Sequence, residues 1–324
     1  MSLLDELVES DFVKISRSPD FDHFRRIEGL GEASSIPLGV RDFAASFAAL
    51  RLRNCTIYLQ RTFPRILQVQ YSTTGAIVGL LMDDEASLTV NGMEARPPVL
   101  LLVKGTAKCE IVEQQANLVA FVYFDSIDDR GWPGEADCAQ VVDTEHARYD
   151  VLRATVRDAL TLASHSPEML AQPEVIESIE ESMLQAVDLA MAAASPAPDG
   201  KRLSLSHYLV LVRKFDEFVV ANAGKTMYSA DVARQLGVSV RTLHNAVVAI
   251  RGMSMHRYMR LRRLWNVRQQ LVRADAPQSI KAIALAHGFW HMGEFTSLYR
   301  DLFGETAQQT LSAIRKPADG RSRC

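Results

Sequence analysis

Between residues 40 and 125 the hydrophobic residues come in short runs separated by turn-forming residues. The runs are rich in Val, Ile, Leu and aromatic residues, and Gly, Pro, Asp and Asn lie between them, which is typical of short β-strands. Asn91-Gly92 is a signal for a two-residue hairpin. Regular short strands favour an antiparallel sandwich or barrel, and a small barrel can enclose one ligand. The pattern predicts strands at Thr56–Leu59, Ile66–Tyr71, Ala76–Leu81, Ser87–Val90, Val99–Val103 and Asn117–Phe124.

The spacing of apolar residues becomes helical from about Glu145 to Ser164, and again from Glu174 to Ala194. Two Xaa-Pro pairs separate these segments, because the residue before a proline is pushed out of the helical region. Two helices joined by a short turn form a hairpin, which could pack on its own domain or form a dimer seam. The apolar stripe through Ile179, Met183 and Val187 leads us to expect a contribution to a homodimer.

Beyond residue 200 the pattern is helical and contains an internal repeat, in which Leu243 corresponds to Phe295 at an offset of 52 residues. One copy closes at Gly252 and the other at Gly304. In both copies the apolar residues fall on one helical stripe and polar residues occupy matching places on the opposite face. A second, preceding helix in each copy begins near a serine that could cap it, Ser229 in the first and Ser279 in the second.

A helix, a short turn containing glycine and a second helix with a polar outer face form a helix-turn-helix unit, whose second helix lies in the major groove of DNA. Between the two units, Met255–Arg273 predicts one continuous helix of about 19 residues, hence about 28 Å long. That length is comparable with the ~34 Å between successive major grooves on one side of B-DNA. Its arginines are expected to include internal ion-pair partners, with one or two reaching phosphate.

The two halves of the chain carry opposite charge. Residues 1–200 hold 16 basic and 31 acidic residues, a net charge of −15, whereas residues 201–324 hold 20 and 8, a net charge of +12. A basic segment on an acidic protein is typical of nucleic-acid binding, because Lys and Arg release counterions from phosphates. Charge alone would equally fit a membrane surface or an acidic protein partner. Ser195–Gly200 lies at the charge break and has the composition of a linker.

The polar face of the first repeat helix offers side chains that can read bases. Arginine pairs bidentately with guanine, asparagine pairs with adenine, and histidine can donate or accept at a base edge. Solvated polar residues are the ordinary alternative, but the repeat and the basic charge favour base reading. Met292 lies at the margin of the core stripe, where it could pack or touch a thymine methyl group. The candidate DNA-binding residues are Ser239, Arg241, Thr242, His244, Asn245, His291, Met292, Gly293, Thr296, Ser297 and Arg300.

Residues 205–315 resemble the DNA-binding domain of the AraC/XylS family of bacterial transcription regulators. The resemblance covers about a third of the chain, and it implies that the N-terminal half is a ligand-sensing or dimerising domain, often a cupin-like barrel. It rests on Val232–Ser239, Arg263–Arg268 and Ile283–Phe289, followed by Phe295, Tyr299 and Phe303-Gly304.

Three positions depart from the family pattern. Met255 and Ala307 stand where members often carry proline, and Thr310 stands where an aromatic residue is usual. Because these positions help to dock the ends of the units, we expect the last helix to be packed less firmly than in other members.

The sequence contains no recognisable catalytic or metal-binding pattern. Cupin barrels can hold a metal through clustered histidines and a carboxylate, but residues 40–125 contain no histidine, and the four cysteines are far apart. No apolar run approaches the 18 or so residues needed to cross a bilayer, and the first residues are acidic where a signal peptide would be basic. We therefore expect no enzyme, no cofactor, no metal and no membrane partner, and a location in the reducing cytoplasm.

The combined prediction is an α+β chain with an N-terminal antiparallel β-barrel, a helical hairpin and an all-α domain with two helix-turn-helix units. The predicted function is sequence-specific regulation of transcription through double-stranded DNA, controlled by a small-molecule effector, with a homodimer as the expected state and RNA polymerase as partner of an activator. The alternative is a regulator that acts by dimerisation or protein binding without an effector. A module that only sequesters another regulator would not need the polar groove-facing surface. The predicted segments are a β-rich sensing domain (1–144), a hairpin that could dimerise (145–194), a linker (195–204), the double helix-turn-helix domain (205–318) and a tail (319–324).

Overall fold

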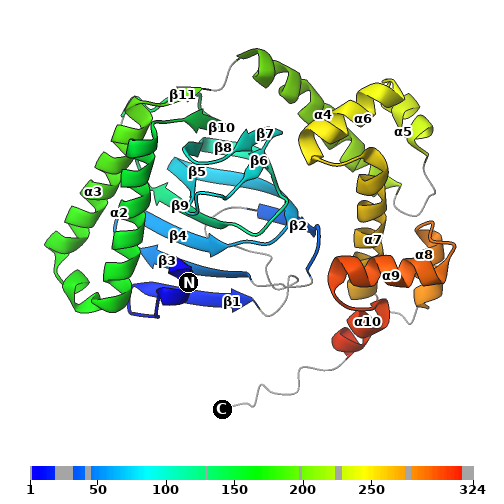
Figure 1. Cartoon of the computed structure of the whole chain (residues 1–324), viewed down its shortest axis with the longest axis horizontal. Coiled ribbons are helices and arrows are strands. Elements are labelled where there is room, and N and C mark those ends of the chain that lie inside the picture. Colours follow the sequence, from blue (N-terminus) through cyan, green and yellow to red (C-terminus); the bar gives the residue numbers. More distant parts are fainter. Residues whose placement is uncertain are drawn as a thin grey trace. The chain divides into compact units, whose positions relative to one another are not determined.

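The computed structural model describes residues 2–18, 32–40, 45–127, 130–196, 199–222, 228–273 and 279–315. The chain forms two compact units, one of Met1–Ser35 with Phe43–Leu203 and the other of Ile36–Asp42 with Ser204–Cys324. The first unit is built on an antiparallel sheet with helices, and the helices α4–α10 make up the bulk of the second (Figure 1). The predicted fold class is thereby confirmed. The predicted tail at 319–324 lies outside the described residues.

The sheet of the first unit pairs its strands in the order β1-β3-β4-β9-β5-β8-β10-β11, with β2 beside β5 and the β6–β7 hairpin beside β8. Every printed pairing between these strands is antiparallel. The strands are β1 Val13–Ser18, β2 Glu32–Pro37, β3 Ala45–Arg51, β4 Cys55–Arg61, β5 Arg65–Leu81, β6 Leu88–Val90, β7 Met93–Ala95, β8 Val99–Glu113, β9 Leu118–Phe124, β10 Cys138–Asp143 and β11 Ser195–Pro196.

Strand β5 unites two of the predicted strands into one of 17 residues. An irregularity between Ser72 and Ala76 bends it, so that it pairs with β8 on both sides of the bend and with β9 beyond it. The predicted hairpin is confirmed, because Asn91 and Gly92 have φ angles of 51° and 81° and connect β6 to β7. The sequence prediction did not include β1, β2, β3, β7, β10 and β11, nor the second half of β8.

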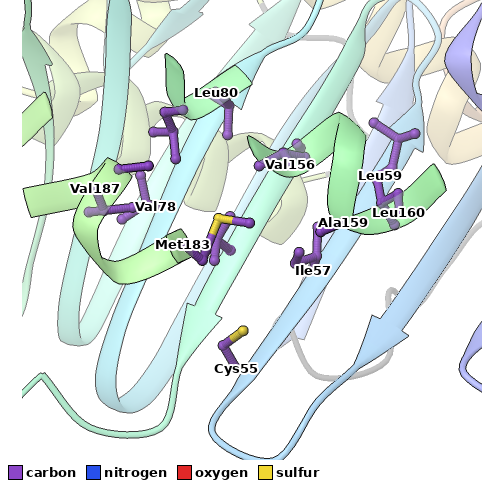
Figure 2. Close-up of a cluster of buried hydrophobic side chains, with 14 of the residues drawn as sticks. Cys55, Ile57, Leu59, Val78, Leu80, Val156, Ala159, Leu160, Met183 and Val187 are labelled. Atoms are coloured by element: carbon purple, nitrogen blue, oxygen red, sulfur yellow. The ribbon is translucent and has the colours of Figure 1, made fainter. Parts of the chain in front are cut away.

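One face of the sheet is covered by helices α2 (His146–His165) and α3 (Pro173–Ala192), which the turn η1 (Pro167–Ala171) joins, and by the short α1 (Leu3–Glu6). Alternate residues of a strand point to opposite faces, and the apolar residues on this face interlock with the helices. Figure 2 shows the contact between Ile57, Leu59, Val78 and Leu80 of the sheet and Val156, Ala159, Leu160, Met183 and Val187 of the hairpin.

This packing uses the stripe on which the expected dimer seam rested. Met183 and Val187 are fully buried against the sheet, and Ile179 is half-buried at the edge of the same cluster. The homodimer stays a prediction, but it no longer has this stripe as its support.

Cys55 lies inside this core, and the reactivity of its thiol measures how well the core is closed. Burial, and after it the Glu180 and Asp125 carboxylates, raise the pKa of the Cys55 thiol to about 12. Because the thiolate is the reactive form, iodoacetamide at about pH 8 is expected to modify the half-buried Cys138 well before Cys55. Mass spectrometry of peptides from the briefly treated native chain measures the two rates. Equal rates at Cys55 and Cys138 would show that this core is open.

The second unit contains the helices α4 Asp199–Ala221, α5 Ser229–Gln235, α6 Val240–Arg251, α7 Met255–Arg273, α8 Ile280–Ala286, α9 Met292–Phe303 and α10 Ala307–Arg315. The predicted spacer helix is confirmed, since α7 has the predicted bounds and 19 residues. The predicted linker at 195–204 overlaps regular structure, because Ser195–Pro196 pairs with β10 and α4 begins at Asp199. Residues 197 and 198 lie outside the described part.

Candidate nucleic-acid interface

The internal repeat of the sequence is also a repeat of structure. Helices α6 and α9 each have 12 residues, and each ends at a glycine in the left-handed region, Gly252 with φ 65° and Gly304 with φ 71°. Only glycine adopts this conformation without strain, and it allows the chain to leave the helix sharply. The second helices of the two units α5–α6 and α8–α9 therefore have the same length and the same stop.

The caps of the first helices differ between the two units. Ser279 caps α8 as predicted, because its Oγ accepts the N–H of Ala282 at 3.1 Å. Ser229 does not cap α5. The cap position is Tyr228, whose carbonyl oxygen accepts the N–H groups of Asp231 and Val232, so the helix begins at Ser229 itself.

The predicted core faces of α6 and α9 are buried, and their predicted polar faces are exposed. Among the candidate residues, Thr242 and Met292 are half-buried. The α6 set therefore shares one exposed face, and the α9 set shares another. The exposed candidates are Ser239, Arg241, His244 and Asn245 on α6, and His291, Gly293, Thr296, Ser297 and Arg300 on α9.

Three of the hydroxyl groups already have internal partners. Ser239 caps α6 by accepting the N–H of Thr242 at 3.0 Å, and the hydroxyls of these two residues lie 2.8 Å apart. Thr296 Oγ1 donates to the carbonyl oxygen of Met292, one turn earlier in α9, at 2.8 Å. Side chains on α6 can also extend further toward a base than the short side chains on α9, because α6 carries Arg241, His244 and Asn245.

Exposed apolar side chains on or beside the two helices were not among the candidates. Val240 and Val248 are each 42% exposed on α6, and Trp290 is 68% exposed in the turn before α9. Val248 lies one turn after His244, on the polar face, where its spacing could have singled it out. Apolar groups at such positions can contact thymine methyl groups, so α6 presents donors, an acceptor and a methyl-sized apolar contact together.

A buried ion pair holds the end of α6 in place. Arg251 Nη2 lies 2.6 Å from Asp216 Oδ2 of α4, and the Arg251 side chain is fully buried. Tyr258 Oη of α7 donates to the other carboxylate oxygen of Asp216. Burial, with a smaller contribution from the Asp216 carboxylate, raises the pKa of Tyr258. One carboxylate therefore ties three helices together behind the exposed face of α6.

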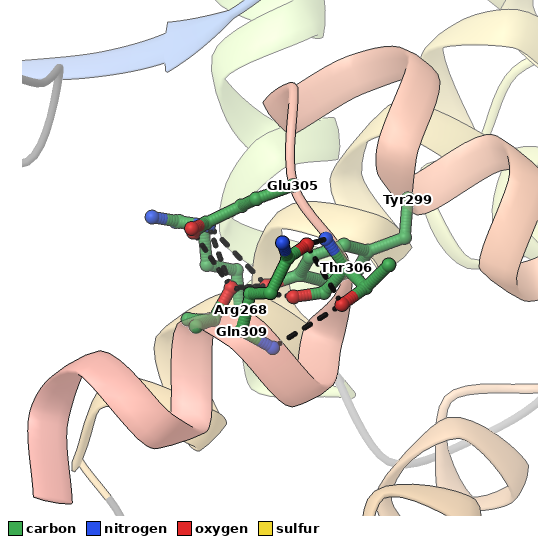
Figure 3. A network of polar contacts seen from close by, with 6 residues as sticks. Arg268, Tyr299, Glu305, Thr306 and Gln309 are labelled. Atoms are coloured by element: carbon green, nitrogen blue, oxygen red, sulfur yellow. Dashed lines mark hydrogen bonds and ion pairs between the residues drawn. The ribbon is translucent and has the colours of Figure 1, made fainter.

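A second polar network holds the end of α9 (Figure 3). Arg268 Nη1 of α7 donates to Glu305 Oε1 at 2.6 Å and to Thr310 Oγ1 at 3.1 Å. The hydroxyl groups of Tyr299 and Thr310 lie 2.9 Å apart, and Thr310 is 3% exposed. Polar contacts thus dock α10 to α7 and α9 through Thr310, and the looser packing of the last helix relative to other members stays a prediction.

The other spacer residues also have internal roles. Arg268 confirms that the spacer arginines include an ion-pair partner, and Arg263 lies with its guanidinium 5.2 Å from the centre of the Phe289 ring. At the end of α8, His287 Nε2 lies 2.9 Å from Oε1 of Gln270 in α7, and the backbone N–H of His287 donates to the carbonyl oxygen of Ile283.

The described residues contain neither a cluster of metal ligands nor a helix that could span a membrane. Within the described ranges, no three His, Cys, Asp or Glu side chains come together as metal ligands would. Among the helices described for this chain, none has both the length and the apolar character needed to cross a membrane.

Comparison with known proteins matches residues 232–313 to a family described as a helix-turn-helix domain. The chain is 32% identical over 105 residues to the probable thc operon regulatory protein of Rhodococcus erythropolis, covering 32% of each chain. It is 33% identical over 101 residues to the XylDLEGF operon transcriptional activator of Pseudomonas putida, covering 31% of this chain and 32% of the relative. The match thus spans about a third of the length of each relative. The crystal structure of the AraC-like transcriptional activator CuxR aligns over 80% of this chain and 96% of its own, with 16% identity and a TM-score of 0.43.

Proposed function

We propose that this chain, whose C-terminal domain is a helix-turn-helix domain of the AraC/XylS type, is a sequence-specific DNA-binding regulator of transcription controlled by a small-molecule effector. The observation that carries the proposal is the pair of matched helices α6 and α9, whose polar faces are exposed in the half of the chain that bears a net charge of +12. The effector would bind the N-terminal unit. A regulator that acts by dimerisation or protein binding alone is the second candidate.

In this proposal α6 and α9 enter successive major grooves, with α7 as the spacer between them. The base edges are read mainly from α6, by Arg241, His244 and Asn245. Helix α9 contributes short side chains and Arg300, which suit contacts to the phosphate backbone. A homodimer, a cytoplasmic location and, for an activator, contact with RNA polymerase belong to the same proposal.

The DNA-binding part of the proposal predicts that the C-terminal half of the chain binds DNA and that the N-terminal half does not. A fragment of residues 199–324, which includes all of α4, is expected to bind DNA with an affinity that falls steeply with salt, because its cationic side chains displace counterions. A fragment of residues 1–198 is expected not to bind. Fluorescence anisotropy with a labelled duplex at several salt concentrations measures both. Equal DNA affinity of the two fragments, or no salt dependence, would contradict the proposal.

A further inference from the structure

The sheet face that the helices leave uncovered forms a second hydrophobic core, and polar side chains lie at the edge of this core. Tyr58, Leu67, Val69 and Phe121 belong to this core, on the strands β4, β5 and β9. Four polar residues lie at its edge and are at most 3% exposed: Gln60, Thr62, Arg65 and Glu113. Burying polar groups costs free energy unless they are hydrogen-bonded, so each of the four is expected to have a hydrogen-bond partner in the chain or in a ligand.

Three of these residues are paired within the fold. Arg65 Nε lies 2.6 Å from Glu113 Oε2, with both side chains at most 4% exposed. Thr62 Oγ1 accepts the N–H of Asn117 at 3.0 Å and donates to the carbonyl oxygen of the same residue. These contacts join β4, β5 and β8 with the loop before β9, and they account for the three side chains as parts of the structure.

Gln60 is different. Its Nε2 is buried and, within the described part of the chain, donates to no acceptor. The side chain lines a hollow with about 450 Å³ of empty space, counted with its open mouth, and the rest of the lining is mostly apolar, including Leu67, Ile111 and Phe121. A buried amide donor without an acceptor, on the wall of an apolar hollow, is complementary to a ligand that brings an acceptor.

The charges in the hollow define the class of ligand further. Arg65 and Glu113 line it as a mutually neutral pair. Because the pair is neutral overall, a charged ligand would meet one like charge for each opposite charge and would still lose its hydration in a site of low dielectric constant. Uncharged ligands avoid this desolvation cost.

We infer that this hollow binds a small, uncharged, mainly apolar carbonyl compound whose oxygen accepts a hydrogen bond from Gln60 Nε2. The inference rests on the proposed function, because it gives the effector a site and a chemical class. The hollow is narrow inside, so a ring-sized ligand must displace part of the wall. A neighbouring hollow of about 360 Å³ shares Leu88, Ile111, Val119 and Phe121 with the first.

Probes of similar size and different charge test this inference on the full chain. Benzamide, acetophenone and cyclohexanone supply neutral carbonyl groups, benzoate supplies an anion, and benzylammonium supplies a cation. At millimolar concentrations we expect at least one neutral probe to raise the melting temperature in a concentration-dependent way, as a ligand of the native state does. The same probe should shift the side-chain amide resonances of Gln60, assigned by their loss in Gln60→Leu. Benzoate and benzylammonium should do neither.

Matched variants make the role of the amide testable. Gln60→Leu is expected to weaken binding of the neutral probe about tenfold, the cost of one hydrogen bond to a buried donor. Gln70→Leu, an exposed glutamine on β5, should leave it unchanged. The inference is overturned if no neutral probe binds, if benzoate binds better, or if Gln60→Leu binds as tightly as the parent chain. DNA binding by the same preparations is a separate readout, so a chain that binds DNA and no probe refutes this inference alone.

Discussion

Asp216→Ala is expected to lower the free energy of unfolding of the C-terminal unit by about 3–5 kcal/mol, the usual cost of removing one partner of a buried ion pair. The Asp216 carboxylate accepts from Arg251, which is fully buried, and from Tyr258. Without it, the buried guanidinium loses the carboxylate 2.6 Å away, and the buried phenol loses an acceptor. Chemical denaturation of the full chain, followed by circular dichroism in the helical region, measures the loss as a lower midpoint for the helical transition.

Asp231→Ala is the matched control. Asp231 also pairs with an arginine, Arg234, at 2.7 Å, but the two side chains are 51% and 74% exposed. Exposed pairs of this kind contribute little, so this variant should unfold with the parent chain. If Asp216→Ala unfolds at the same denaturant concentration as Asp231→Ala, the ion pair at the end of α6 does not hold the unit together.

Arg241→Ala is expected to cost about 1–3 kcal/mol of discrimination between the right and wrong base at one position of the DNA site, the value of a good bidentate contact. Arg241 is exposed on α6 and is followed on the same face by His244, Asn245 and Val248. Removing it should relax the preference within one half of the site while the rest of the site stays selected. Selection of bound duplexes from a randomised pool, followed by sequencing, measures the preference at each position.

The second recognition helix supplies the controls for this prediction. Thr296→Ala and Ser297→Ala should cost less, because short hydroxyls bond to almost any base edge, and Thr296 already donates to the backbone of α9. Arg300→Ala should weaken binding to all sequences alike, as the loss of a phosphate contact does. Specificity that survives Arg241→Ala and collapses with Ser297→Ala would reverse the roles of the two helices.

The helical half of the chain follows closely from its sequence. The apolar spacing that predicts α7 and the repeat behind α6 and α9 are local signals, and the stopping glycines are equally local. The docking of α10 could not be predicted from local signals of this kind. Thr310 is a poor substitute for an aromatic residue by size, and only the structure brings Arg268 and Tyr299 to its hydroxyl group.

The sheet is harder to predict from the sequence, because strands that pair in it are far apart along the chain. Glu110 and Glu113 make the second half of β8 look exposed, yet both are buried, and Glu113 pairs with Arg65 across the strands. The edge strand β1 reads VKISRS and has only one fully buried residue, so its hydrophobic signal is weak. Gln60 directly follows the predicted strand Thr56–Leu59, and its unusual environment becomes visible only when β4, β5 and β8 are assembled.

The unbroken helix α7 has a consequence for the evolution of the DNA sites such a chain would serve. A rigid rod of 19 residues leaves the two reading helices no freedom to follow a change in the separation of their targets. Inserting a single base pair between the targets would rotate one of them by about 34–36° around the duplex, given the 10–10.5 base pairs of each turn. In the proposed mode of binding, the DNA sites would therefore diverge by base substitution and not by insertion or deletion between the two targets, so that the spacing between the targets stays fixed.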